Sequence, residues 1–373
     1  MSSTDARILH IVDRIDVGGM ERNLFEIVRA TRDDFEHHVC CLRGASKLED
    51  EFVGIGALVH HQATSGRGAF AAIAGLTRLV RQLRPAIVHA RNWGTAEAVP
   101  AARIGGTRAV VYGEHGRRSV PRLRRREWGR WLLAPFVDAI VAPSDDVRAY
   151  LTDEVGIAAG RIRVIRNGVD TDRFRPVADR AALRARLGIE PDAEVVVALG
   201  RMKESKNLPV LVAALERLSR KRPRLSLVLV GDGEDRVRVE RTARELGVAK
   251  RMRLTGMRDD VEHWLAAADV LAHTSRSEGS SNAILQGMAC GLPVVATDLG
   301  ANAEIVDPGE TATLVPVGDV AAVAAAIAGY LADDARRRQH GNAARHRVLS
   351  RYPLHGMTEG YRKLYSELAY GHT

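Results

Sequence analysis

The sequence has few cysteines, few aromatic residues and no long apolar run. Its three cysteines, Cys40, Cys41 and Cys290, show neither a metal-ligand spacing nor an even set for disulfides, so we expect a reducing compartment. No apolar stretch approaches the roughly 20 residues of a membrane-spanning helix, and the alanine-rich run at 319–332 predicts a buried helix. The first residues, MSSTDARILHIV, lack the pattern of a secretory signal. We therefore expect a cytoplasmic protein.

Metal-binding and dinucleotide-binding patterns are also missing. No cluster of His, Cys, Asp or Glu has ligand spacing, so we expect no structural or catalytic metal. Asp170-Thr171-Asp172 has the D-x-D form with which some nucleotide-sugar enzymes hold a metal. It lies in a turn-rich segment, however, and we expect its aspartates to cap the turn. LVLVGDGED lacks the third glycine of a nicotinamide fingerprint, since Arg236 occupies that place, which disfavours a nicotinamide-dependent oxidoreductase.

Short apolar runs alternate with helical patterns along nearly the whole chain. Continuous apolar strands separated by amphipathic helices are typical of parallel sheets covered on both faces. The predicted strands are 7–12, 86–90, 108–113, 139–143, 162–167, 194–200, 225–231, 252–256, 269–274, 292–297 and 312–317. These are too many for one doubly wound sheet, and 373 residues exceed one typical core. We predict an α/β protein with two Rossmann-like domains whose parallel sheets face each other across a cleft.

The turn-rich segment RNGVDTDRFRP at 166–176 marks the predicted domain boundary. We predict an N-terminal domain over residues 1–170 and a C-terminal domain over 171–352. The remaining segment, 353–373, is expected to form a helix that packs back on the first domain.

Residues that directly follow the predicted strands are candidates for chemistry, because ligands of open parallel sheets bind beyond the strand ends. Gly18 and Gly19 permit a close turn into a helix N-terminus that faces a phosphate, or a tight turn without a ligand. His115 follows strand 108–113 and either contacts a sugar hydroxyl or is structural.

Cationic residues follow two strands of the second half. Arg201 and Lys206 suit a diphosphate leaving group, since arginine is a bidentate donor and lysine a point charge. The alternative is a pair of surface cations. Arg258, after strand 252–256, either lies against a nucleobase or belongs to a simple turn.

The most informative segment is SEGSSNAILQGMACGLPVVAT at 277–297. It predicts a loop carrying Glu278, then the N-cap candidates Ser280, Ser281 and Asn282, an apolar helix and a buried strand. Helix N-termini attract anions because their first N–H groups lack partners. A carboxylate beside an anion site indicates a ligand with both phosphate and hydroxyl groups, and a nucleotide sugar is such a ligand.

Positive charge is concentrated in one segment. The net charge is +9, and Arg117–Arg130 holds seven arginines and one glutamate. Arginines interleaved with tryptophans suit an interfacial segment that faces anionic lipid, although a solvated basic helix is the alternative. Nucleic acid is not expected, because no recognised binding module accompanies the segment. The candidate residues for the membrane or the acceptor are Arg124, Arg125, Arg126, Trp128 and Trp131.

Taken in order, these motifs resemble the retaining glycosyltransferases of the GT-B fold, of the group 1 or family 4 type. The resemblance covers nearly the whole chain: the Gly-Gly turn, His115-Gly116, RNGVDTDRF, GRMKESKN, VGDG, the run at 259–300 and VPVGD. It implies a hexose transferred, with retention and without a metal or cofactor, from a UDP- or GDP-sugar. The acceptor would be a glycan, expected to be lipid-linked at the inner face of the cell membrane.

The resemblance also implies residue roles in a C-terminal domain that binds the nucleotide sugar. Arg201 and Lys206 would hold the donor diphosphate and stabilise it as it leaves. Glu278 would hydrogen-bond the transferred sugar, near the N–H groups of residues 280–282.

In the N-terminal, acceptor-binding domain, the resemblance assigns a sugar contact to His115 and a place beside the phosphates or the acceptor to Gly19. One departure lies here. The residue before the family's His-Gly pair is usually small and polar, whereas Glu114 brings a negative charge close to an anionic donor.

Gln286 is a second departure, since the family has a glutamate there, eight positions after Glu278, that grips the ribose hydroxyls. An amide still accepts and donates hydrogen bonds but loses charge assistance, worth about 1 kcal/mol. We interpret Gln286 as a tolerated variant, and a weakly active or non-catalytic glycan-binding protein is the alternative. A second alternative is a GT-B-fold nucleotide-sugar epimerase. Such an enzyme needs acid-base side chains at the sugar, and only His115 and Glu278 are candidates for that role.

Overall fold

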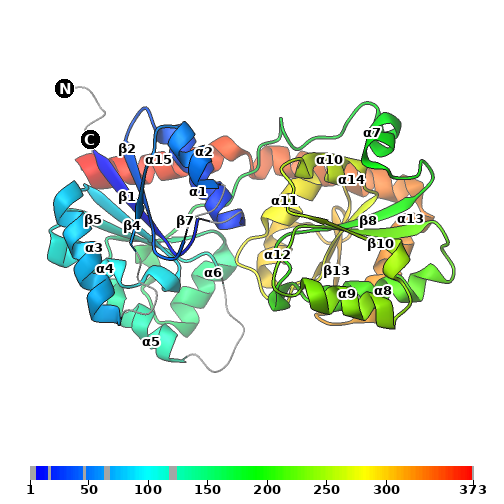
Figure 1. Ribbon diagram of the computed structural model, residues 1–373, viewed down its shortest axis with the longest axis horizontal. Helices are drawn as coiled ribbons and strands as arrows, with labels where there is room; N and C mark the ends of the chain where they lie inside the picture. The colour runs from blue at the N-terminus through cyan, green and yellow to red at the C-terminus, as the bar shows by residue number, and fades with distance from the viewer. Residues whose placement is uncertain (1–5, 16–17, 45–47, 63–67, 117–123, 372–373) are drawn as a thin grey trace. The chain divides into compact units, whose positions relative to one another are not determined.

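The chain divides into two compact units (Figure 1). The computed structural model describes residues 6–15, 18–44, 48–62, 68–116 and 127–371, together with the backbone of 124–126. Unit 1 consists of Met1–Asn167 and His355–Thr373, and unit 2 of Gly168–Leu354.

Unit 1 is built on a seven-stranded sheet in the order β3-β2-β1-β4-β5-β6-β7, and all neighbouring strands are parallel. The strand order reverses between β1 and β4, which creates the switch point where such sheets bind ligands. The strands are β1 (Arg7–Val12), β2 (Glu36–Cys41), β3 (Leu58–His61), β4 (Ile87–Arg91), β5 (Ala109–Gly113), β6 (Ala139–Ala142) and β7 (Ile162–Val164).

Strands β2 and β3 were not expected from the sequence. Their sequences, EHHVCC and LVHH, carry histidines where a buried strand usually has apolar residues. The structure buries His37 and His38 because each finds a partner from another strand. His37 Nδ1 lies 3.0 Å from His10 Nε2, and His38 Nδ1 lies 2.9 Å from His60 Nε2. The compensation comes from distant residues, which a local pattern does not reveal.

Helices cover the sheet of unit 1. They are α1 (Gly19–Thr31), α2 (Leu48–Gly54), α3 (Ala69–Leu83), α4 (Ala98–Gly105), α5 (Arg124–Leu133), α6 (Asp145–Ala149) and α15 (Leu354–Tyr370). The C-terminal helix α15 buries Met357, Tyr361, Leu364 and Tyr365, a spacing that places them on one helical face. Tyr365 packs edge-on against Phe35 and His10, with ring centroids 6.0 Å away in both cases.

Unit 2 is built on a six-stranded parallel sheet in the order β10-β9-β8-β11-β12-β13, with its switch point between β8 and β11. The strands are β8 (Glu194–Leu199), β9 (Leu225–Val230), β10 (Met252–Gly256), β11 (Val270–His273), β12 (Val294–Thr297) and β13 (Ala312–Val315). The helices are α7 (Arg180–Leu187), α8 (Leu208–Ser219), α9 (Arg236–Glu245), α10 (Val261–Ala267), α11 (Asn282–Ala289), α12 (Gly300–Ile305), α13 (Val320–Ala332) and α14 (Asp334–Arg351). All eleven strands predicted from the sequence are present, and the α/β class with two Rossmann-like domains is confirmed.

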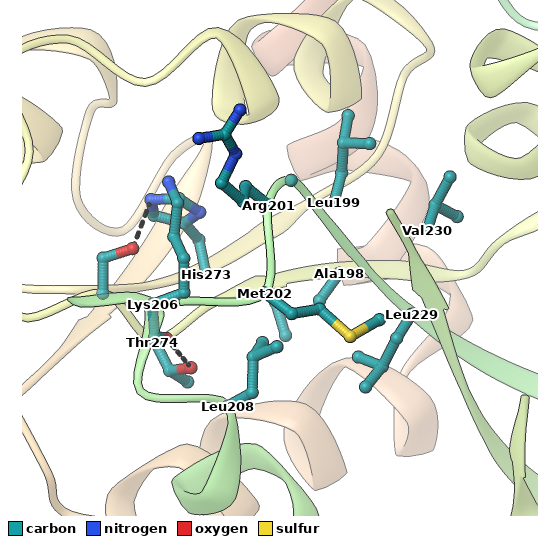
Figure 2. A pocket seen from close by; sticks show the side chains of 13 residues that line it. Ala198, Leu199, Arg201, Met202, Lys206, Leu208, Leu229, Val230, His273 and Thr274 are labelled. Atoms are coloured by element: carbon teal, nitrogen blue, oxygen red, sulfur yellow. Dashed lines mark hydrogen bonds between the residues drawn. The ribbon is translucent and has the colours of Figure 1, made fainter. Parts of the chain in front are cut away.

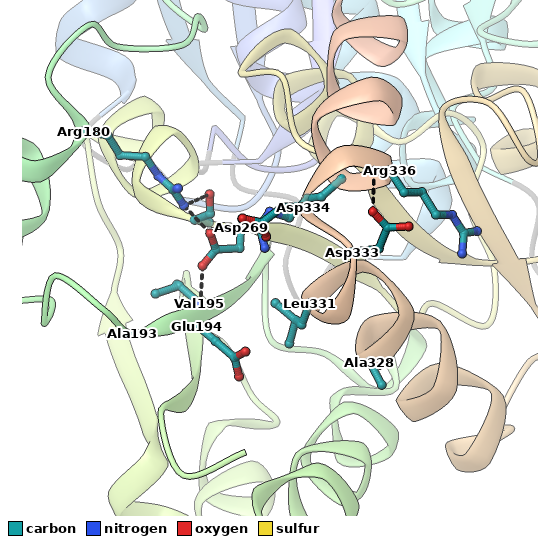
Figure 3. A network of polar contacts seen from close by, with 12 residues as sticks. Arg180, Ala193, Glu194, Val195, Asp269, Ala328, Leu331, Asp333, Asp334 and Arg336 are labelled. Carbon is teal, nitrogen blue, oxygen red and sulfur yellow. Dashed lines mark hydrogen bonds and ion pairs between the residues drawn. The ribbon is translucent and has the colours of Figure 1, made fainter. Parts of the chain in front are cut away.

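A buried carboxylate joins α7 to two strands of unit 2 (Figure 3). Asp269, just before β11, accepts hydrogen bonds from Arg180 at 2.6 Å and Arg184 at 2.9 Å. It also accepts the backbone N–H of Val195 in β8 at 2.7 Å. Burial by itself would raise the pKa of Asp269, but the two guanidinium groups and the N–H lower it. Asp269 is therefore an ionised anchor in the core.

The alanine-rich run forms α13, which buries Val323, Ile327, Tyr330 and Leu331. Across the part of the chain that the structure describes, no helix combines the length and apolarity required to traverse a membrane.

Candidate functional site

The candidate site of unit 2 lies at the carboxyl ends of β8 and β11, the switch point of the sheet. A solvent-open pocket of about 310 Å³ occupies this edge. Figure 2 shows Arg201, Lys206 and His273 on one side of it and the apolar side chains of Met202 and Leu229 on the other. The lining residues are Ala198, Leu199, Gly200, Arg201, Met202, Lys206, Leu208, Leu229, Val230, Ala272, His273, Thr274 and Ser275.

Lys206 and Glu278 form a charged pair at this edge. Lys206 ends the short 3₁₀ helix η5 (Glu204–Lys206), and its Nζ lies 2.5 Å from Glu278 Oε1, with both side chains largely buried. His273 Nε2 lies 3.1 Å from the same oxygen. Burial by itself would raise the pKa of Glu278, but Lys206 and His273 hold it well below its usual range. The carboxylate is therefore ionised, and both donors meet its Oε1.

His273 is a site residue that the sequence did not indicate. It ends β11, is buried, and its Nε2 also lies 3.1 Å from Ser275 Oγ and 3.2 Å from Ser281 Oγ. Burial lowers the pKa of His273, and the positive charge of Lys206 lowers it further. The hydrogen bond with Glu278 acts in the opposite direction but does not outweigh them. A neutral imidazole that donates its Nε2 hydrogen to Glu278 fits these contacts. One histidine within an apolar strand gives no signal of such a role.

The N-terminus of α11, at Asn282, follows the loop that carries Glu278, as predicted. Of the three N-cap candidates, the structure selects Ser281, whose Oγ accepts the backbone N–H of Ile284 at 3.4 Å. Ser280 and Asn282 flank this cap and are half-buried. Gln286 is also half-buried, one turn further along the same helix.

Two other cations lie near the Lys206–Glu278 pair. Arg201 follows β8 and lines the pocket. Lys203 is close enough to interact electrostatically with Lys206, Arg201 and Glu278. Lys203 was not singled out from the sequence, although its place in GRMKESKN between two predicted cations is the signal that could have found it.

Arg258 is placed differently from the other donor candidates. Its guanidinium forms a two-pronged ion pair with Asp260, at 2.8 Å for both contacts, and lies 5.9 Å from the centre of the Trp264 ring. It is absent from the pocket lining. The structure thus brings Arg201, Lys206 and Glu278 to one edge but does not bring Arg258 into their pocket.

The glycines of LVLVGDGED have a packing role. Gly231 has φ +131°, and a Cβ there would lie 2.2 Å from the carbonyl oxygen of Gly200. A Cβ at Gly233 would lie 2.3 Å from the oxygen of Met202. Only glycine lets the chain segments after β8 and β9 approach this closely, so these glycines need no dinucleotide to explain them.

The D-x-D segment also has a structural explanation. Asp170 Oδ1 accepts the backbone N–H groups of Asp172 and Arg173 at 3.1 and 3.0 Å, which confirms the predicted capping role for Asp170. Among the residues whose positions are described, no group of three or more His, Cys, Asp or Glu side chains could hold a metal ion.

Unit 1 carries its own candidates at the switch point between β1 and β4. Gly19 begins α1, whose N-cap, Gly18, provides no side-chain hydrogen bond. His115 follows β5, and its backbone N–H donates to Asn92 Oδ1 at 2.8 Å. Its imidazole Nε2 lies 3.3 Å from Arg91 Nη1. Burial and the charge of Arg91 lower the pKa of His115 to about 3, so the ring is neutral.

Glu114 does not present a free negative charge. It is buried, its Oε2 lies 2.5 Å from Arg130 Nε of α5, and it accepts the Tyr112 hydroxyl at 3.2 Å. The concern that Glu114 would repel an anionic ligand is removed, because Arg130 compensates its charge within unit 1.

The aromatic residues predicted to face a membrane are exposed. Trp128 and Trp131 on α5 are 68% and 50% accessible, and their rings stack with centroids 6.3 Å apart. Leu132 and Phe136 are exposed beside them in the sequence. The side chains of Arg124, Arg125 and Arg126 lie outside the described residues.

Comparison with known proteins agrees with this arrangement. Residues 17–173 match the family model "Glycosyltransferase Family 4", and residues 193–333 match "Glycosyl transferases group 1". The chain is 34% identical over 269 residues to the GDP-mannose-dependent alpha-(1-6)-phosphatidylinositol monomannoside mannosyltransferase of Mycolicibacterium smegmatis, covering 68% of this chain and 69% of that protein. It is also 34% identical over 203 residues to the lipopolysaccharide core biosynthesis glycosyltransferase LpsE of Rhizobium meliloti, covering 54% of this chain and 57% of LpsE. The chain thus spans little more than half the length of LpsE.

Among solved structures, the fold is similar to that of Anabaena HepE, determined in complex with UDP and glucose. The TM-score is 0.85 at 22% identity, covering 96% of this chain and 99% of HepE. The two family models, the identity to the mannosyltransferase and the two doubly wound sheets lead to one conclusion. The chain belongs to the group 1 and family 4 glycosyltransferases and has the GT-B fold.

Proposed function

We propose that this chain transfers a hexose from a nucleoside diphosphate sugar to a hydroxyl group of a growing glycan, with retention at the anomeric carbon. The observation that carries this proposal is the Lys206–Glu278 pair beside the pocket at the N-terminus of α11. The use of GDP-mannose by the mycobacterial relative and the UDP bound to HepE support a nucleotide-sugar donor.

The charges suggest how the donor would bind. A diphosphate offers Lys206 a stronger partner than Glu278, and Arg201 and Lys203 add positive charge on the same side. Glu278, released from Lys206 but still held by His273, would accept hydroxyl groups of the sugar. Exchange of partners keeps every buried charge compensated before and after binding.

The same residues would promote the reaction. The bond from the anomeric carbon to the diphosphate breaks as the bond to the acceptor oxygen forms on the same face. The acceptor proton goes to the departing phosphate. Negative charge develops on the leaving group, where Arg201, Lys203 and Lys206 stabilise it together with the N–H groups at the start of α11. Because these groups supply the positive charge, we propose that the reaction needs no metal.

Turnover and stereochemistry test this proposal. The chain is incubated with UDP- and GDP-hexoses and a bacterial membrane lipid extract as acceptor, and the product is analysed by proton NMR. We expect release of the nucleoside diphosphate, a product with the anomeric configuration of the donor, and a rate unaffected by EDTA.

Glu278→Gln should abolish turnover, and Glu245→Gln, at an exposed position of α9, serves as the matched control. An inverted product would contradict retention. Conversion of the donor into its epimer without transfer would indicate an epimerase instead.

We also propose that the acceptor is lipid-linked and that α5 docks on an anionic membrane surface. The exposed pair Trp128 and Trp131 carries this proposal, within a segment that has seven arginines.

Sedimentation with phosphatidylglycerol vesicles tests whether α5 docks on an anionic membrane surface. Replacing both tryptophans by serine, or Arg124, Arg125 and Arg126 by serine, should reduce binding, whereas the control Val237→Ser at an exposed apolar site should not. Unchanged binding of both multiple variants would contradict the proposal.

A further inference from the structure

Unit 1 contains a fully buried arginine at its switch point. Arg91 is the last residue of β4 and is 0% exposed. Within the described ranges, no carboxylate forms an ion pair with it. A buried charge without a counter-charge is destabilising unless hydrogen bonds compensate it. The charge of Arg91 must therefore be compensated by the neutral groups that it contacts.

The groups around Arg91 are neutral. Its Nη2 lies 3.4 Å from His89 Nδ1, which also accepts the Tyr365 hydroxyl of α15 at 2.8 Å. Its guanidinium carbon lies 5.6 Å from the centre of the Tyr361 ring. Burial and the charge of Arg91 lower the pKa of His89 well below its usual value. None of these groups explains why a cation is needed here.

Arg91 also forms side-chain hydrogen bonds with Tyr361 and Tyr365, and it contacts His115. Arg91 Nη1 lies 3.3 Å from His115 Nε2. A guanidinium only donates hydrogen bonds, so Nε2 must be the acceptor and the proton of the neutral ring must be on Nδ1. An imidazolium in this position would place two cations in contact.

The backbone at Asn92 and Gly113 holds the His115 ring beside Arg91. Asn92 has φ 64° and ψ 169°, a strained conformation for a residue other than glycine. In this conformation its Oδ1 accepts the N–H of His115, and its Nδ2 lies 3.0 Å from Met20 Sδ at the start of α1. At Gly113, a Cβ would lie 2.9 Å from His115 Nε2 and 3.1 Å from His89 Nε2. Only glycine leaves room for both rings.

We propose that Arg91 is the positioning residue of His115 and fixes its imidazole as the neutral tautomer with the proton on Nδ1. His115 would then act toward the ligand as a hydrogen-bond donor and would not transfer a proton. The role toward a ligand rests on the proposed function, whereas the tautomer is a property of the chain alone.

The other titratable groups near this site do not replace Arg91. From β1 comes His10 and from α15 come Tyr361 and Tyr365, all of which are buried. Burial lowers the pKa of His10 and raises the pKa of both tyrosines, so all three are neutral. Glu114 is paired with Arg130.

Nitrogen-15 NMR of the full chain, labelled at histidine, tests the tautomer directly. His115 is assigned from the spectrum of a His115→Gln variant. In the wild type we expect a protonated Nδ1, an unprotonated Nε2, and a ring that stays neutral to the lowest pH at which the chain is folded.

In Arg91→Met, the pKa of His115 should rise from about 3 toward the ordinary value of about 6.5, and the tautomer should become mixed. Thr31→Val is the control, since it removes the partner of His37 without touching Arg91. A wild-type ring protonated on Nε2, or one that titrates near its ordinary value, would overturn the proposal even if Arg91→Met fails to fold.

Kinetics separate this inference from the proposed function. If the chain is active, Arg91→Met should lower kcat by about 10- to 100-fold, the size expected for a lost hydrogen bond to a charged group, and should introduce a new pH dependence. Arg91→Lys should recover part of the rate. A flat pH profile in an active Arg91→Met would count against the inference. Absence of turnover in the wild type with every donor would contradict the proposed function and leave the NMR result standing.

Discussion

At the scale of single residues, the candidate residues of each unit include charges that compensate one another. Lys206 neutralises Glu278, His273 supports the same carboxylate oxygen, and Arg130 neutralises Glu114. Each of these contacts joins residues far apart in the sequence except His273 and Glu278. A ligand with phosphates and hydroxyls can replace the first contact without leaving a buried charge unpaired.

Gln286 offers a test at this scale. Gln286→Glu introduces the carboxylate that the resemblance to the family implies for the ribose, and charge assistance should improve nucleoside diphosphate binding by about 1 kcal/mol, or roughly fivefold in Kd. Isothermal titration calorimetry measures this change. Gln339→Glu, at an exposed position of α14, is the control for added negative charge. Weaker binding by Gln286→Glu would show that the amide is matched to this chain's ligand.

The sequence indicated that Arg201, Lys206 and Glu278 lie at one sheet edge because they follow strands, and parallel strands end at a common edge. It did not reveal His273 or Arg91. Each is a polar residue at the end of a mainly apolar strand, and its importance depends largely on partners supplied by other elements.

At the scale of elements, buried polar residues explain why strand β2 was not predicted and how α7 is held to the sheet of unit 2. Strand β2 escaped prediction because its histidines are polar, yet they form a hydrogen-bonded chain. The Thr31 hydroxyl donates to the oxygen of Ile27, so it accepts from His37 Nε2, and His37 Nδ1 in turn accepts from His10 Nε2. Because His37 Nδ1 is an acceptor here, the His37 ring must be neutral for this chain to form.

This histidine chain predicts that acid destabilises the protein. Burial lowers the pKa of His37 to about 4, while the unfolded chain has the ordinary value of about 6.5. Between these values the unfolded state binds more protons, so stability is full above about pH 6.5 and falls as the pH decreases toward 4. His37 alone should cost about 2 kcal/mol at pH 5 relative to pH 7. Urea unfolding at both pH values measures the loss, and equal stability at both would contradict the neutral chain.

Asp269 predicts a large loss of stability at neutral pH. Asp269→Ala leaves Arg184 buried without its carboxylate and should destabilise unit 2 by about 3–5 kcal/mol. The exposed Asp192, paired with Arg224 at 3.1 Å, provides a matched control, since an exposed ion pair contributes about 0–1 kcal/mol. Urea unfolding compares the two variants. Similar small effects from both would show that the Asp269 cluster does not anchor α7.

At the scale of the whole molecule, the sequence predicted two doubly wound units because their strands are apolar and their helices periodic, signals that are local and repeated. The order of the strands within each sheet was not predictable in this way. That order places one switch point in each unit, and the residues that follow the flanking strands are those expected to meet a ligand. Arg258, which belongs to the loop after the edge strand β10, is instead paired with Asp260.

The central claim is that the edge of unit 2 binds a nucleoside diphosphate sugar through Lys206 and Glu278. Thermal denaturation of the full chain with UDP, GDP, ADP and their sugars tests it most directly, since a ligand at 100 times its Kd stabilises a protein by about 2.7 kcal/mol. We predict that at least one diphosphate raises Tm and that its sugar raises it further. Lys206→Met should abolish the shift, and the exposed control Lys250→Met should retain it. A chain whose Tm responds to none of these nucleotides would contradict the account.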